Sequence, residues 1–257
     1  TSESGAITYS ASGSVALSVL ASTSGPLNVT ATNGTITDNT IGELPTLVTT
    51  ATATLDAATG IGSEGVADID TALGTLVATN RVSGDIVVQE TDTLIVGGTG
   101  VQTLGGDGNI NLDVDAGSLT INGMVAAHGS GTVILNVDAG AVNINAAVSS
   151  TSGALNVMGD SIVQSGGGDL TTGGAAAIHV TAVNGDITMG DGAITTSDSG
   201  AINYIATGSV ALSVLTSTSG LLNVTATNGA ITDNTAGELA NLVTSMTATL
   251  DAAIGIG

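Results

Sequence analysis

The sequence has almost none of the large side chains from which a globular core is usually built. Its 257 residues include no Phe, Trp or Cys and only two Tyr, although 42% of the residues are hydrophobic. A compact domain of this length normally buries bulkier groups. The absence of Cys excludes disulfides and thiolate metal sites. Val, Ile, Leu and Ala suffice for a thin core, which is typical of solenoids, because each repeat there packs only on its neighbours.

Positive charge is also nearly absent. Arg81 is the only Lys or Arg, and 22 Asp and Glu residues give a formal net charge of −21. Nucleic acids and anionic lipid surfaces both attract proteins through Lys and Arg, so the sequence excludes both as partners. No apolar run approaches the roughly 18 residues of a membrane helix, and we expect no membrane insertion in this segment.

The sequence does contain a long internal repeat. Residues 1–62 return as residues 196–257, and the two copies are identical at 49 of 62 positions. A repeat this long and this well kept indicates a tandem array. We therefore predict that residues 1–257 form one continuous segment, in which residues 1–195 are one full repeat and residues 196–257 begin the next.

A shorter period lies inside the long one. Short runs of alternating apolar and polar residues, each ended by Gly or Asn-Gly, recur every 20 to 23 residues. The apolar positions that mark this period are Val114, Val137, Val157, Val180, Ile202 and Val224. Alternation predicts half-buried strands, and a period in the twenties predicts a solenoid. We expect an all-β parallel β-solenoid (β-helix) with about nine turns per 195-residue repeat.

In such a solenoid, equivalent residues of successive turns stack about 4.8 Å apart. We expect the inner stack to include Val114, Val137 and Val157. The outer stack beside it is expected to include Asp113, Asn136 and Asn156, with Asn amides paired along the axis.

Residues 40–100 are less regular. The stretch Ile41–Leu55 contains Pro45 and is open to a short helical or loop excursion, whereas the rest of the segment still alternates like strands. We predict four turns with distorted corners between residues 40 and 100.

Several stretches of the sequence resemble the filamentous-haemagglutinin-type surface proteins, which are giant bacterial exoproteins and adhesins. The resemblance lies in Gly-x-Ile-x-Leu strands, in Asp-Ala-Gly corners, and in the stretches Ala57–Gly62 and Thr79–Ile86. It runs over essentially the whole chain. It implies a right-handed parallel β-helix and a secreted rod that projects from or coats the cell, but it does not imply a particular target.

Enzymatic activity is not expected. Some polysaccharide lyases and hydrolases are β-helices, but they cluster carboxylates with Arg, Lys or His on one face. Here the cationic candidates are Arg81, His128 and His179, which are far apart in the sequence. His179 lies between two apolar strand residues and is expected to point outward, and His128 lies at a corner. We therefore expect no catalytic residues and no cofactor.

One group of carboxylates is a candidate for calcium. Asp113, Asp115 and Asp138 are expected near one edge of adjacent turns, where stacked like charges repel. Ca²⁺ would relieve that repulsion through oxygen ligands. Solvated charge that keeps rods soluble is the favoured interpretation, because the sequence lacks a glycine-aspartate calcium repeat.

The function that these features favour is structural: a repeat segment of a giant secreted filament or adhesin stalk on a bacterial cell surface. Its partners would be neighbouring copies of the repeat, end to end, and a host, cell or matrix surface. Nine turns would give an axial repeat of roughly 43 Å. Two alternatives stay open. One is a solenoid module that binds carbohydrate or protein, and the other is a functional amyloid built from separate small subunits.

Overall fold

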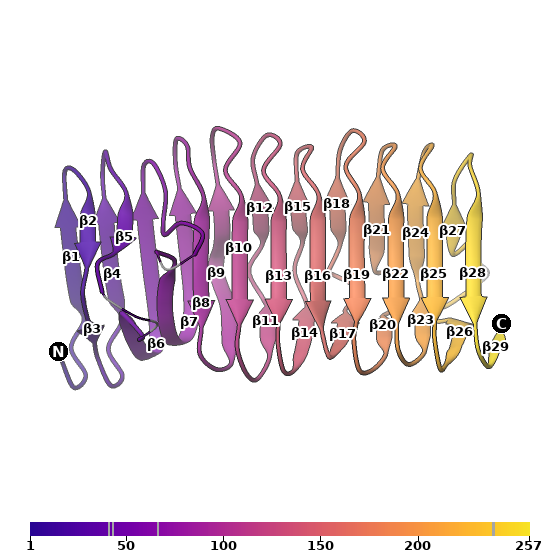
Figure 1. Ribbon diagram of the computed structural model, residues 1–257, viewed down its shortest axis with the longest axis horizontal. Helices are drawn as coiled ribbons and strands as arrows, with labels where there is room; N and C mark the ends of the chain where they lie inside the picture. Colours follow the sequence, from indigo (N-terminus) through magenta and orange to yellow (C-terminus); the bar gives the residue numbers. More distant parts are fainter. Residues whose placement is uncertain (41, 43, 66, 238–239) are drawn as a thin grey trace.

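The computed structural model describes residues 1–40, 42, 44–65, 67–237 and 240–257. The regular secondary structure of these residues consists of β-strands alone. The strands stack into an elongated rod with the two termini at opposite ends (Figure 1). All the strand pairs described are parallel, and strands of successive turns lie next to each other. The predicted parallel β-solenoid is therefore confirmed.

Each turn has three faces, which we call A, B and C in the order in which the chain passes them. Face A holds β2 (Val15–Leu17), β5 (Ile36–Asp38), β8 (Ile86–Glu90), β10 (Ile110–Val114), β13 (Val133–Val137), β16 (Leu155–Gly159), β19 (Ile178–Ala182), β22 (Ile202–Ala206), β25 (Leu222–Ala226) and β28 (Ala248–Ala252). Between β5 and β8, Ile61 supplies the face A position as an isolated bridge to Ile36 and Ile86.

Face B begins with β3 (Leu20–Ala21). It continues through the first parts of the long strands β6 (Leu47–Ala57), β7 (Ile69–Asn80) and β9 (Leu94–Thr103). The first three residues of β7 also pair with Val88–Glu90 of β8 on face A. The remaining strands of face B are β11 (Leu119–Ile121), β14 (Ala141–Ile144), β17 (Ser161–Gln164), β20 (Ile187–Met189), β23 (Val210–Leu212), β26 (Ala230–Asp233) and β29 (Gly255–Ile256).

Face C begins with β1 (Ile7–Ala11) and β4 (Leu27–Ala31) and continues through the second parts of β6, β7 and β9. It is completed by β12 (Val125–Ala127), β15 (Val148–Ser150), β18 (Leu170–Thr172), β21 (Ile194–Ser197), β24 (Val214–Ser217) and β27 (Leu242–Val243). These eleven crossings of face C correspond to about eleven turns.

The core is the narrow space between the three faces. In β10 the inward residues Ile110, Leu112 and Val114 are fully buried, while Asn111 and Asp113 alternate with them on the outside. The same alternation recurs on face A in β13, β16, β19, β22 and β25. Period-two patterning thus places one row of aliphatic side chains inside at every turn.

The expected stacking was correct in part. Val137 stacks on Val114, and Asn136 stacks on Asp113, as predicted. Val157, however, stacks on Leu135 instead of Val137, because the step from β13 to β16 is 22 residues and the step before it is 23. The predicted outer stack is wrong at the same place: Asn156 lies over Ile134, not over Asn136.

The irregular segment contains fewer turns than the sequence suggests. Leu55 stacks against Ala78, and Ala78 against Val101, so only two turns separate residues 55 and 101. The prediction of four turns between residues 40 and 100 is wrong, because β6, β7 and β9 each pass from face B to face C without a break in the strand. The described part of 41–55 is loop and then β6, without a helix. Ile41 and Glu43 lie outside the described residues.

The long repeat also holds fewer turns than expected. Eight stacked steps lead from Ser10 to Thr196 and cover 186 residues. The nine residues left over are less than half of a turn. The 195-residue repeat therefore holds slightly more than eight turns, just below the expected nine, and its length is about 40 Å at 4.8 Å per turn.

Glycine serves the corners in two different ways. Gly117 has a φ of +86°, the left-handed conformation that glycine adopts without a steric penalty. Gly131 has no positive φ, but a Cβ atom there would lie 2.1 Å from the carbonyl oxygen of Gly108 in the turn below. At this second kind of corner, the close approach of two backbones requires glycine.

The sequence Ser-x-Ser-Gly occurs six times, and five of these copies form one kind of corner, at residues 2–5, 22–25, 150–153, 197–200 and 217–220. In each of these five the first Ser hydroxyl accepts a hydrogen bond from the Gly N–H, at 2.8–3.0 Å. In four copies the same hydroxyl also donates to a carbonyl of the turn below. In these four corners one Ser hydroxyl thus provides a hydrogen-bond partner for two backbone groups, the Gly N–H and a carbonyl of the turn below.

Ser217→Ala should destabilise the solenoid, because the buried N–H of Gly220 and the carbonyl of Gly200 lose a shared partner. We expect a loss of about 1–3 kcal/mol in the free energy of unfolding, measured by chemical denaturation. Ser219→Ala is the matched control, since Ser219 is exposed in the same corner. Equal effects of the two substitutions would contradict the role of the buried hydroxyl.

Candidate functional site

The predicted carboxylate cluster lies on the outer side of face A, and amide side chains separate its members. Nδ2 of Asn136 donates to Oδ1 of Asp113 at 2.8 Å and to Oδ1 of Asp138 at 2.9 Å. Nε2 of Gln89 donates to Oδ1 of Asp115 at 2.8 Å. The structure therefore brings the three predicted carboxylates to one edge, but each is already bound to an amide.

The charge state of Asp113 reflects this crowding. Partial burial raises the pKa of its carboxyl, and the nearby charges of Asp138 and Asp115 raise it further, against the opposing hydrogen bond from Asn136. Among the described residues there is no group of three or more His, Cys, Asp or Glu side chains arranged to hold a metal ion. Calcium binding at Asp113, Asp115 and Asp138 therefore stays a prediction, without a preformed cluster to support it.

Amide side chains also pair along the rod axis. Nδ2 of Asn223 donates to Oδ1 of Asn203 at 2.8 Å, and Nδ2 of Asn145 donates to Oδ1 of Asn122 at 2.9 Å. His179 extends the first of these stacks, because its Nδ1 lies 3.2 Å from Nδ2 of Asn203. The predicted pairing of Asn amides is thus present, at positions other than Asn136 and Asn156.

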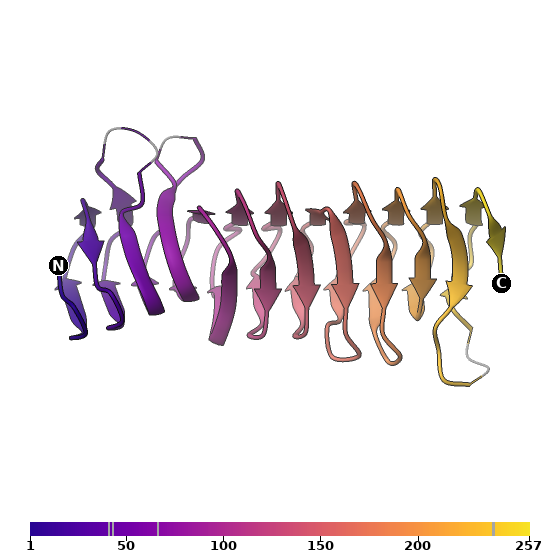
Figure 2. The ribbon, with the colours of Figure 1, turned by 90° about the horizontal axis from the view of Figure 1, so that it is seen from below.

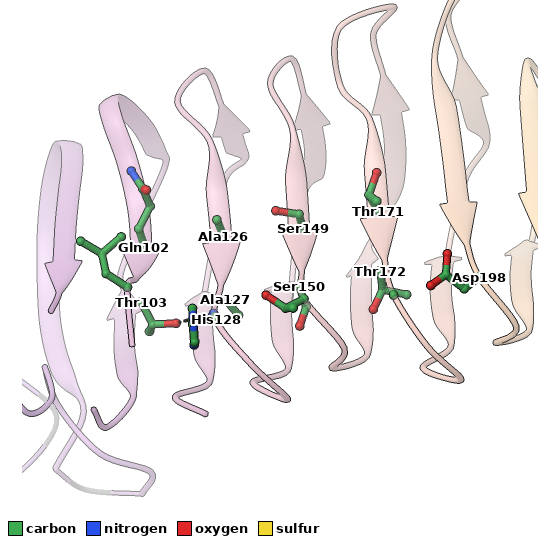
Figure 3. A pocket seen from close by; sticks show the side chains of 13 residues that line it. Gln102, Thr103, Ala126, Ala127, His128, Ser149, Ser150, Thr171, Thr172 and Asp198 are labelled. Carbon is green, nitrogen blue, oxygen red and sulfur yellow. Dashed lines mark hydrogen bonds between the residues drawn. The ribbon is translucent and has the colours of Figure 1, made fainter. Parts of the chain in front are cut away.

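Face C carries an open groove of about 510 Å³ on its outer side (Figure 3). Four outward residues stacked on successive turns form its floor: Gln102, Ala126, Ser149 and Thr171. Gln102 lies at one end of this row, Asp198 lies beyond the other end, and His128 borders the groove beside Ala127. No Phe, Tyr or Trp lines this groove. Its surface can form hydrogen bonds through hydroxyl and amide groups, but it offers no Phe, Tyr or Trp ring on which a sugar could stack.

No match to the chain was found among protein-family models, curated proteins or solved structures. Among the described residues there is also no helix long and apolar enough to cross a membrane. The geometry of the solenoid itself is therefore the basis for any functional proposal.

Arg81 and the two histidines lie apart. Arg81 forms an ion pair with Asp56 at 2.5 Å and donates to the carbonyl of Thr32 at 2.8 Å. His128 lies at the corner after β12, with Nδ1 2.8 Å from the carbonyl oxygen of Gly106. His179 is exposed on face A, as predicted. The structure therefore does not gather them around one site.

A buried carboxylic acid, Glu90, was not foreseen in the sequence. It ends β8 at an inward position, in alternation with the buried Ile86 and Val88. Its carboxyl group accepts hydrogen bonds from the Thr71 hydroxyl at 2.8 Å and from the Leu73 N–H at 3.0 Å. Burial raises its pKa from 4.5 to about 7, although these hydrogen bonds oppose the shift.

Glu90 makes the stability of the chain depend on pH. Because its pKa is raised by folding, the stabilising effect of its proton is present below pH 4.5 and is lost as pH rises through about 7. Relative to the native chain, Glu90→Gln should gain roughly 3 kcal/mol of unfolding free energy between pH 4.5 and pH 8.5. Denaturation of both proteins at the two pH values measures this.

Glu3→Gln provides the control, since Glu3 is exposed. It should leave the pH dependence of the native chain unchanged. A Glu90→Gln chain whose stability follows the same pH curve as the native chain would show that folding does not raise the pKa of Glu90.

Proposed function

We propose that this chain is a structural repeat segment of a giant secreted filament or adhesin stalk on a bacterial cell surface. The observation that carries the proposal is that each end of the rod exposes residues which the other copy of the repeat buries. Tyr9 is 54% exposed, whereas its equivalent Tyr204 is fully buried. Ile256 is 55% exposed, whereas its equivalent Ile61 is fully buried.

The burial of Tyr204 shows what the N-terminal end lacks. Tyr204 stacks between Val180 and Val224, and its hydroxyl donates to Oε1 of Gln164 at 2.8 Å and lies 2.6 Å from Oγ1 of Thr195. Gln164 and Thr195 both come from turns that precede Tyr204. At Tyr9 only the following turn is present, through Val29. A preceding turn of the same kind would complete this end.

The C-terminal end also exposes residues that the other copy of the repeat buries. Leu250 and Ile256 lie on the last turn, and the equivalent Leu55 and Ile61 are covered by strands of the next turn, β7 and β8. Unpaired strand edges of this kind are templates for further pairing. Both ends therefore favour continuation of the stack by neighbouring copies of the repeat.

The flanks suit an exposed rod. The formal net charge of −21 keeps neighbouring rods apart in solution. Arg81, the single site available to trypsin, is held by its ion pair and by a backbone hydrogen bond to Ala57. Proteases need locally unfolded chain, and the axial hydrogen bonds oppose such unfolding. These features, and the resemblance to filamentous-haemagglutinin-type proteins, support an extracellular structural role and a chain without enzymatic activity.

The groove on face C favours a second candidate, a flank that binds carbohydrate or protein. Its row of small and hydroxyl-bearing residues along four turns would accept an extended polar ligand. The lack of Phe, Tyr or Trp rings makes this candidate weaker than the structural role.

The proposal is tested on intact cells that produce the protein. Antibodies raised against residues 1–257 should label unpermeabilised cells, and the labelled chain should survive proteinase K that digests an ordinary domain within minutes. A secreted rod predicts both results. Labelling that requires permeabilisation would overturn the surface location, and rapid digestion would overturn the structural role. Binding of the chain to a glycan array would favour the second candidate.

A further inference from the structure

One unbroken stack of outward residues follows face C along nearly the whole rod. Its members are Ser10, Thr30, Asp56, Thr79, Gln102, Ala126, Ser149, Thr171, Thr196, Thr216 and Val243. Residues of this stack lie directly above one another, one turn apart. Eight turns above Ser10 the stack has reached Thr196.

The sequence equivalent of Ser10 in the second copy is Ile205, and it does not belong to this stack. Ile205 lies on face A, where it stacks on Thr181, and the stack beneath it leads back to Gln89. Nine further residues and one corner separate Ile205 from Thr196. The repeat therefore does not close on itself: eight turns bring the chain back to face C, and the repeat ends one face later.

The same displacement holds for other strands that the two copies share. Strand β1 lies on face C, but its equivalent β22 lies on face A. Strand β2 lies on face A, but its equivalent β23 lies on face B. Strand β5 lies on face A, but its equivalent β26 lies on face B. Each equivalent has advanced by one face in the same direction.

We propose that the 195-residue repeat acts as a screw element, which turns each successive copy by one face, about a third of a turn, around the rod axis. This rests on the proposed tandem array. Each copy advances by about 40 Å, and the same surface returns to the same side after three copies and about 25 turns, or roughly 120 Å at 4.8 Å per turn.

The screw determines where the rod displays its repeated surface features. The connection after β5 and the equivalent connection after β26 leave the stack on different sides in Figure 2. In the first of these connections Leu44 is 68% exposed. An array built in this way offers that connection in three directions, so it can contact surfaces or neighbouring rods on all sides.

Distances between spin labels test the screw on the 257-residue chain itself, which has no Cys to interfere. Pairs of Cys are placed at Ser10 and Thr196, and at Ser10 and Ile205, and measured by double electron–electron resonance. The first pair should lie roughly 38 Å apart along the axis, and the second pair should be clearly further apart, because it adds a change of face. Thr30 with Thr216, and Thr30 with Thr225, repeat the comparison one turn higher.

The possible results distinguish a failure of the proposed screw from a failure of the stacked solenoid itself. If Ser10 lies closer to Ile205 than to Thr196, at about 43 Å, the repeat contains nine whole turns and the screw is wrong, while the rod stands. If no pair shows a distance near 38 Å, the stacked solenoid itself is wrong. Distances that follow the expected order in both comparisons support the screw, whatever the location of the protein in the cell.

Discussion

The backbone hydrogen bonds that run along the axis, from each turn to the next, determine every other feature of this molecule. They hold successive turns about 4.8 Å apart, so each inward side chain must fit directly on its counterpart. One such column contains Val15, Ile36, Ile61, Ile86 and Ile110. Branched aliphatic side chains stack well at this spacing and fill the narrow interior between the three faces.

The same constraint explains the polar groups that are buried. A corner that approaches the turn below has no room for a side chain, so the Gly and Ser of the Ser-x-Ser-Gly motif carry the hydrogen bonds there. Tyr204 is the one ring fully inside the described core, and it needs Gln164 and Thr195 as partners for its hydroxyl. Burial raises the pKa of Tyr204, so that it remains a neutral donor.

Alternation and period were enough to predict the parallel solenoid, but not its register. The register depends on how many residues each corner uses, and the apolar pattern does not show this number. The prediction therefore puts Val157 over Val137, whereas Val157 lies over Leu135. Strand β7 continues from one face to the next without a break. The prediction treats each alternating stretch there as one turn, and so it gives too many turns between residues 40 and 100. The carboxylates were correctly placed at one edge, but their amide partners Gln89 and Asn136 were missed. The alternation of Ile86, Val88 and Glu90 did signal a buried acid.

Disulfide formation between stacked outward residues tests the axial register most directly. Asn203 and Asn223 are stacked partners on face A. With Cys at both positions, the Cα atoms should lie within the 4.4–6.8 Å that a disulfide requires, and mild oxidation should join them. Cys at Asn203 and Thr225, displaced by two residues, should stay reduced under the same conditions. Cross-linking of the displaced pair, or failure of the stacked pair alone, would contradict the register on which the whole account depends.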